Sequence, residues 1–212
     1  MSGQATDGMR TVLVAMHYQN EVLDPRGKIR VGVAAEDPNR AALKHNAARL
    51  LAGARALGIP VVSVRIAFAA GHADVNRNCK IFRDVVANDA MVEGSWGAAF
   101  HESLGPIGDE FVVKHSRVNA FYGSQLEEIL RVLRAERLIM AGIATNSVVE
   151  TSVRHAADMG YEVIVASDAC SCARPELHQA SLENMRYVAD VMTVDEVLRV
   201  SARTPAPASG TP

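Results

Sequence analysis

The sequence predicts a three-layer α-β-α domain built on a mostly parallel six-stranded sheet. Short apolar runs alternate with helical stripes along most of the chain, at the spacing of β-α-β units. The runs lack polar alternation, which is typical of strands buried on both faces of a parallel sheet. Right-handed crossovers then place helices on both faces, in the Rossmann-like strand order 3-2-1-4-5-6.

The first half of the chain supplies two strands around one long helix. Thr11 to Met16 is a continuous apolar run and is the first predicted strand. A helical stripe of apolar residues from Leu43 to Leu57 follows and ends at Gly58. Val61 to Ile66 is the second run. Residues 67 to 109 are irregular apart from a short helix, and long loops inside a compact domain are often functional.

The second half repeats the alternation of strand and helix. Strands are predicted at Glu110–Lys114, Leu138–Ala141, Tyr161–Ala166 and Val191–Thr193, and helices near 126–133, 147–159, 175–187 and 194–200. We therefore expect a single domain over residues 11–201. Residues 1–10 and the Pro-, Ala- and Ser-rich residues 202–212 are expected to be disordered.

Composition excludes several classes of protein. The 212 residues carry a formal net charge of −2 and no basic stripe, so nucleic acid and membrane partners are not expected. No apolar stretch reaches the length of a membrane span, and the start of the chain does not read as a signal peptide. The three cysteines lack the spacing of a disulfide framework, which favours a cytoplasmic location.

Two charged or titratable residues follow predicted strands at the edge where ligands bind in such sheets. His17 comes directly after the first strand, and Lys114 ends the third. A lone lysine at a strand end is usually a surface residue, and a lone histidine is usually structural. Together at one crevice, the lysine would favour a neutral His17 that accepts a proton.

The segment after the fourth strand begins a helix and holds a serine. Ser147 is a candidate nucleophile, but Ser147 and Glu150 also have the spacing of a helix capping box, which we favour. Cys170 and Cys172 lie near the same rim, where small buried cysteines are commoner than reactive ones. His72 and Asp74 are too few to indicate a metal site, and we expect no metal.

Three segments together resemble the isochorismatase-like (cysteine hydrolase) superfamily. The chain reads His17-Tyr18-Gln19-Asn20 after the first strand, Val112-Val113-Lys114 followed by Asn119-Ala120-Phe121, and Ala141-Gly142-Ile143-Ala144-Thr145-Asn146 running on to Asp168-Ala169. Gly94-Ser95-Trp96-Gly97 resembles the loop that precedes the lysine strand of that family. The resemblance covers about residues 11–195 in order and spacing.

The resemblance implies a site of Asp, Lys and Cys, of which only Lys114 matches. His17 stands where the family has Asp, and Val148 stands where it has the nucleophilic Cys. A cis peptide is implied at Ile143–Ala144, with the Ala144 and Val148 amides binding an oxyanion. By their positions at the rim, Gln19, Trp96, Asn119 and Phe121 are further candidates to line the pocket.

Without the cysteine, the usual covalent mechanism is not available from that position. The leading hypothesis is a non-covalent hydrolase of a small anionic or carbonyl-bearing metabolite, using His17 as general acid or base, Lys114 as electrostatic partner, and no cofactor. One alternative is an inactive relative that binds a small molecule or a protein, and another is a thiol enzyme using Cys170 or Cys172. The family resemblance also implies a homodimer or homotetramer.

Overall fold

The computed structural model describes residues 8–34 and 36–203. It contains a six-stranded sheet in the order β3-β2-β1-β4-β5-β6, and every pair of neighbouring strands is parallel. The predicted fold class and strand order are therefore confirmed. Residues 1–7 and 204–212, which hold most of the two predicted disordered ends, lie outside the described residues.

The strands are buried as the apolar runs predict. Their bounds are Thr11–Met16 (β1), Val61–Ile66 (β2), Phe111–His115 (β3), Arg137–Gly142 (β4), Glu162–Ala166 (β5) and Asp190–Met192 (β6). The central strands β1 and β4 are buried along almost their whole length, because helices cover both faces of the sheet. The edge strand β3 instead alternates, with Val113 and His115 buried and Lys114 between them exposed.

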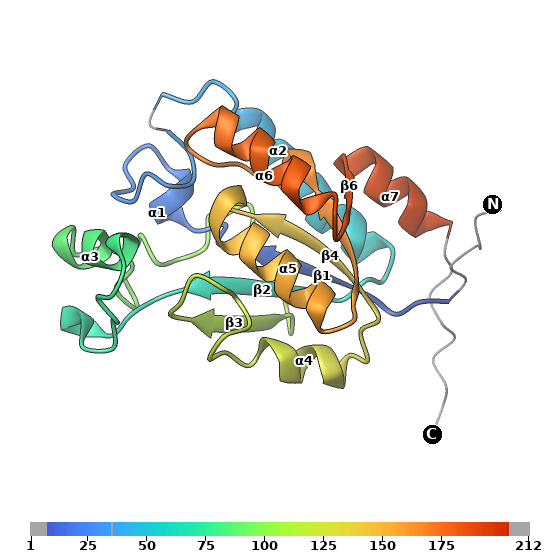
Figure 1. Ribbon diagram of the computed structural model, residues 1–212, viewed down its shortest axis with the longest axis horizontal. Helices are drawn as coiled ribbons and strands as arrows, with labels where there is room; N and C mark the ends of the chain where they lie inside the picture. The colour runs from blue at the N-terminus through green and yellow to red at the C-terminus, as the bar shows by residue number, and fades with distance from the viewer. Residues whose placement is uncertain (1–7, 35, 204–212) are drawn as a thin grey trace.

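Helices form a layer on each face of the sheet (Figure 1). Their bounds are Asn20–Leu23 (α1), Arg40–Ala56 (α2), Lys80–Ala87 (α3), Leu126–Val132 (α4), Glu150–Asp158 (α5), Pro175–Met185 (α6) and Val194–Ala202 (α7). Helix α2 packs against α7, and α5 packs against α6. The short helices α1 and α3 lie beyond the arrowheads of β2 and β3, at the carboxyl edge of the sheet (Figure 1). No helix in the described part of the chain is long and apolar enough to cross a membrane.

The capping box predicted at Ser147 and Glu150 is wrong. A π-helical turn, Thr145–Val149, precedes α5, so Ser147 lies inside the helical segment and neither start has a side-chain cap. The Ser147 amide donates to the Ala144 carbonyl at 3.1 Å, and the Glu150 carboxylate pairs with Arg154. A capping box is present instead at Thr193 and Glu196, where it begins α7.

Candidate functional site

A largely apolar cavity of about 50 Å³ lies at the carboxyl edge of the sheet. Its polar lining residues are His17, Arg117 and Ser147. The apolar lining residues come from the strand ends, α1, α3 and the connecting loops: Val22, Ile29, Val31, Ile66, Ile81, Phe82, Val85, Met91, Val118, Ile143 and Ala144. The cavity thus lies where ligands bind in doubly wound sheets, and the sequence predicted that edge.

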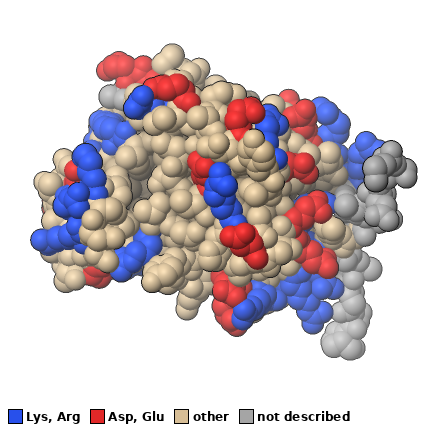
Figure 2. Space-filling model, in the orientation of Figure 1, with Lys and Arg blue, Asp and Glu red and all other residues tan. Residues whose placement is uncertain are grey.

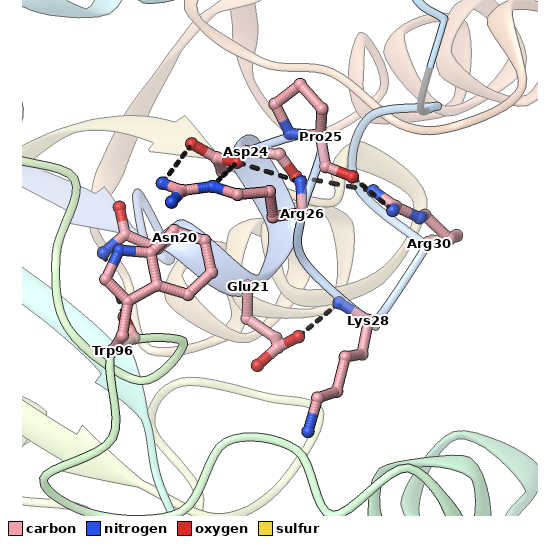
Figure 3. A network of polar contacts seen from close by, with 8 residues as sticks. All are labelled: Asn20, Glu21, Asp24, Pro25, Arg26, Lys28, Arg30 and Trp96. Carbon is pink, nitrogen blue, oxygen red and sulfur yellow. Dashed lines mark hydrogen bonds and ion pairs between the residues drawn. The ribbon is translucent and has the colours of Figure 1, made fainter.

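Residues 24–34, here called the roof loop, contribute Ile29 and Val31 to the cavity. Figure 3 shows the contacts that hold the start of this loop on α1 and on the segment around Trp96. The buried Glu21 carboxylate accepts a hydrogen bond from the Lys28 amide. The Arg26 guanidinium bonds Asp24 at 3.0 Å and stacks on the Trp96 ring, 4.3 Å from its centroid. Trp96 was predicted to line the pocket from its position at the rim; it supports the roof loop instead and is not among the residues that line this cavity.

Further contacts tie the roof loop to segments on both sides of the cavity. The Lys28 ammonium donates to the carbonyls of Asn88 and Asp89, just after α3, at 3.0 and 3.1 Å. The Val31 carbonyl accepts from the Ala173 amide at 3.1 Å. These bonds hold the loop over the cavity, so its apolar side chains are part of a formed wall.

His17 and His115 meet at the strand ends. Their Nε2 atoms lie 2.5 Å apart, and their rings stack with centroids 4.8 Å apart and planes at 26°. Both side chains are buried, and His17 is the one that lines the cavity. At this separation one nitrogen must donate and the other accept, because two bare nitrogens or two N–H groups would repel.

The surrounding backbone assigns the tautomer of His115. Its Nδ1 lies 3.2 Å from the Asn119 carbonyl oxygen, which can only accept, so this nitrogen carries a proton. In a neutral ring the His115 Nε2 is then bare and accepts from the Nε2–H of His17. The arrangement leaves Nδ1 of a neutral His17 unprotonated, as a general base requires.

Burial keeps both rings neutral. It lowers the pKa of His115 to about 4, against the opposing effect of the hydrogen bond to Asn119. Burial is also the largest cause that lowers the pKa of His17, followed by the nearby His115 ring. A backbone hydrogen bond with Ile143 raises the pKa of His17 in opposition. This bond stabilises the charged form: when His17 becomes an imidazolium, its Nδ1–H donates to the Ile143 carbonyl, since the Ile143 amide already donates to Met16.

The sequence analysis expected Lys114 to lie beside His17, but the structure places the lysine elsewhere. The Lys114 ammonium pairs with Glu93 at 3.0 Å, and its side chain is 43% exposed. Glu93 also pairs with Arg65, the residue beside Lys114 on β2, at 2.7 Å. Successive side chains of a strand point to opposite faces, so His115 takes the inward position and Lys114 takes the outward one.

The turn after β4 has the backbone that the family resemblance implies. The Ile143–Ala144 peptide is cis, as expected. Gly142 adopts φ of 149°, and a Cβ there would lie 2.2 Å from the Met16 carbonyl oxygen, so glycine is required. Ala144 lines the cavity, whereas the Val148 side chain is buried in the core. The Val148 side chain carries no group that can attack a substrate.

Three other predicted lining residues have structural roles. The buried Gln19 amide bonds the Ile66 and Ala98 carbonyls at 2.9 and 2.7 Å, and its oxygen accepts from the Ile66 amide. The Asn119 side chain bonds the Thr151 carbonyl and accepts from the Phe121 amide. The Phe121 ring stacks on His155 with centroids 4.9 Å apart. None of the three is among the residues that line the cavity, although the Asn119 backbone orients His115.

Sequence reasoning missed His115 and Arg117, which both follow Lys114. The available signal was strand alternation: once Val113 is placed inward, His115 and not Lys114 faces the same side. The sequence analysis assigned no inward or outward direction to the residues of this strand, which continues to His115. Nothing in the sequence pattern marks Arg117, which lies in the loop after the strand.

The two cysteines near the rim are not activated thiols. Cys170 and Cys172 are both buried and line a different cavity, next to Asp168 and His178. Burial raises the pKa of Cys170 to about 12 and also raises the pKa of Cys172. A thiol that stays protonated is a poor nucleophile, which agrees with the structural interpretation of these residues.

Comparison with curated proteins finds relatives across nearly the whole chain. It is 32% identical to the ureidoacrylate amidohydrolase RutB of Methylobacterium radiotolerans, over 95% of this chain and 84% of that protein. It is 30% identical to the uncharacterized isochorismatase family protein YecD of Escherichia coli O157:H7, over 89% of this chain and 94% of that protein.

Solved structures show the same fold. A cysteine hydrolase from Pseudomonas syringae pv. phaseolicola superposes with a TM-score of 0.83 at 22% identity, over 95% of this chain and 96% of that one. An isochorismatase family protein from Desulfovibrio vulgaris gives 0.81 at 24% identity, over 92% and 100%. The model of the isochorismatase domain matches residues 11–196, and the chain therefore belongs to the isochorismatase family.

Proposed function

We propose that this protein is a hydrolase of small metabolites that works without a covalent enzyme intermediate, with His17 as general base and His115 as its positioning residue. The observation that carries the proposal is the 2.5 Å contact between their Nε2 atoms, with His17 facing the cavity. Membership of a family of hydrolases supplies the reaction class. The proposed mechanism needs neither the family's Asp nor its Cys, which the resemblance places at positions 17 and 148.

The positions of the protons on the two histidine rings suit the activation of a water molecule. His17 Nδ1 takes a proton from a water molecule, and the resulting hydroxide attacks the substrate carbonyl carbon. The imidazolium formed on His17 is stabilised by its Nε2–H bond to His115, whose own Nδ1–H is held by the Asn119 carbonyl. When the tetrahedral intermediate collapses, His17 returns the proton to the leaving nitrogen or oxygen.

The turn after β4 supplies the other element of the mechanism. We assign the Ala144 amide, with that of Val148, to the oxyanion that forms on the carbonyl oxygen. The first turn of a helical segment offers free N–H groups and a partial positive charge to such an anion. With valine at position 148, water is the attacking group.

Several expectations of the sequence analysis remain part of this proposal. We place the protein in the cytoplasm as a homodimer or homotetramer that binds a small-molecule substrate and uses no cofactor, metal, nucleic acid or membrane. The alternative is an inactive relative that binds a small molecule or a protein, and it is supported by the same valine at the turn.

The experiment is a hydrolysis screen read by mass spectrometry. The panel holds primary amides, carbamoyl compounds, ureido acids and enol-ether acids, and the ureido acids are included because one relative is a ureidoacrylate amidohydrolase. The same reactions are run with His17→Asn, His115→Gln and the matched strand variant Lys114→Gln. Hydrolysis that needs both histidines and tolerates loss of the lysine supports the proposal. Hydrolysis that survives His17→Asn contradicts it, and a folded protein with no turnover on any compound favours the binding protein.

A further inference from the structure

Arg117 places an uncompensated cation at the edge of an apolar cavity. Its side chain is half-buried, and its Nη1 donates to the carbonyl and hydroxyl of the adjacent Ser116 at 2.7 and 3.4 Å. No carboxylate in residues 8–34 or 36–203 lies within ion-pair distance of it. A guanidinium in such a place binds planar anions in a bidentate manner, and the remaining N–H groups are available for one.

The remaining side chains of the wall offer no hydrogen bond to a ligand. Apart from His17, Arg117 and Ser147, the cavity is lined only by aliphatic and aromatic side chains and Ala144. A hydroxyl, amide or second charge buried against these side chains would lose its hydrogen bonds to water without replacement. The wall therefore favours a ligand with an apolar body, and the cation at the edge of the cavity favours a negative charge at one end of that ligand.

Charge around the cavity favours an anion. Lysine and arginine side chains gather over the end of the molecule that holds the roof loop and α3 (Figure 2). Of these, Lys28, Arg30 and Arg83 bond only backbone carbonyls, so no carboxylate of the described residues neutralises them. Such a surface draws small anions toward the cavity over roughly a Debye length, about 10 Å.

We infer that the cavity takes a small monocarboxylate with a short aliphatic body, with the carboxylate on Arg117 and the hydrolysable bond beside His17. The second clause rests on the proposed function, whereas the carboxylate site stands without it. A volume of about 50 Å³ accommodates about four to six non-hydrogen atoms. This size and a single guanidinium favour a carboxylate over a phosphate, which needs more donors.

Binding of unreactive probes tests the inference without turnover. The full chain is titrated with isobutyrate and with its neutral isostere isobutyramide by ligand-observed NMR, and inorganic phosphate is the third probe. We expect isobutyrate to bind at least about tenfold more tightly than isobutyramide. Arg117→Gln should remove that preference and leave isobutyramide binding unchanged. The matched control Arg83→Gln removes a nearby exposed charge outside the cavity and should weaken isobutyrate binding less than about threefold.

Each other outcome overturns the carboxylate site. Equal binding of acid and amide, an unchanged preference in Arg117→Gln, or no binding of either probe would show that Arg117 does not anchor a ligand. Tighter binding of phosphate than of isobutyrate would mean that the site is built for an anion other than a monocarboxylate. The hydrolysis screen fails or succeeds independently, since carboxylate binding with no turnover defeats only the proposed function.

Discussion

The Nε2 atoms of His17 and His115 lie 2.5 Å apart although their strands are not neighbours in the sheet. His17 follows β1, His115 ends β3, and β2 lies between those strands. The contact therefore passes over the end of β2, and it depends on the relative register of three strands. A sheet core that fixes this register also fixes the base and its partner in one geometry.

Substituting His115 and Lys114, which are adjacent on β3, in separate variants distinguishes a positioning residue from a surface residue. We expect His115→Gln to lower kcat by about 10- to 100-fold with a smaller change in KM, because His17 loses the acceptor that orients it. Lys114→Gln should change kcat by less than about threefold, since its partner is the surface carboxylate of Glu93. Steady-state kinetics on the compound found in the screen provides the measurement.

The pH profile gives this prediction a second readout. Loss of packing alone would lower kcat at every pH, whereas loss of the orienting ring should also move the acid limb of the profile, because the His115 ring is one cause that lowers the pKa of His17. A variant with normal kcat and an unchanged acid limb would remove His115 from the mechanism.

The buried histidine pair makes stability depend on pH in a defined window. The pKa of His115 falls from 6.5 in an unfolded chain to about 4 in the fold. Above pH 6.5 the ring is neutral in both states and has no effect. As the pH falls from 6.5 toward 4, only the unfolded chain takes up the proton, so the free energy of unfolding decreases by up to about 3 kcal/mol.

Urea denaturation at about pH 7 and about pH 4.5 measures this effect. The loss of unfolding free energy between the two values should be smaller by about 2 kcal/mol in His115→Gln than in the natural chain. His45→Gln changes an exposed histidine of α2 and provides the control. An equal loss in all three proteins would show that His115 does not carry the dependence.

The fold was predictable because it depends on local patterns that repeat. Apolar runs without alternation indicated buried parallel strands, and Thr11–Met16 and Val61–Ile66 have the predicted bounds. The short edge strand was placed one residue early, at Glu110 to Lys114, because an edge strand has one exposed face and a weaker apolar signal. Lys114 ends that predicted strand and matches the family's lysine, but side chains alternate along β3, so Lys114 points outward and His115 points inward.

The cavity wall was not predictable because distant segments build it. The roof loop has no periodic pattern, and its position depends on contacts such as Glu21 with the Lys28 amide and Lys28 with the Asn88 carbonyl. Gln19 and Asn119 lie near the rim as expected, but their amides are used by neighbouring backbone. Position along a strand indicates which edge a residue reaches, and only the packing shows what its side chain contacts.

The buried thiols should not react in the folded protein. With the pKa of Cys170 at about 12, fewer than about one molecule in 10⁴ carries the thiolate near pH 7.5. Iodoacetamide should therefore label the partly exposed Cys79 and leave Cys170 unmodified, as read by peptide mass spectrometry. Cys79→Ala should then take up almost no label. Rapid labelling of Cys170 with parallel loss of hydrolysis would restore the thiol hypothesis.

Two glycines with positive φ allow the cost of atomic crowding to be distinguished from the cost of backbone strain. Gly142 and Gly58 both have positive φ, 149° and 69°, but only at Gly142 would a Cβ meet other atoms, 2.2 Å from the Met16 carbonyl oxygen. We expect Gly58→Ala to lower the free energy of unfolding by about 1 kcal/mol. Gly142→Ala should lower it by about 3 kcal/mol or more, because β1 and β4 must move apart beside the cis turn. Urea denaturation of both variants measures the difference, and equal losses would mean that the turn yields to the added methyl group.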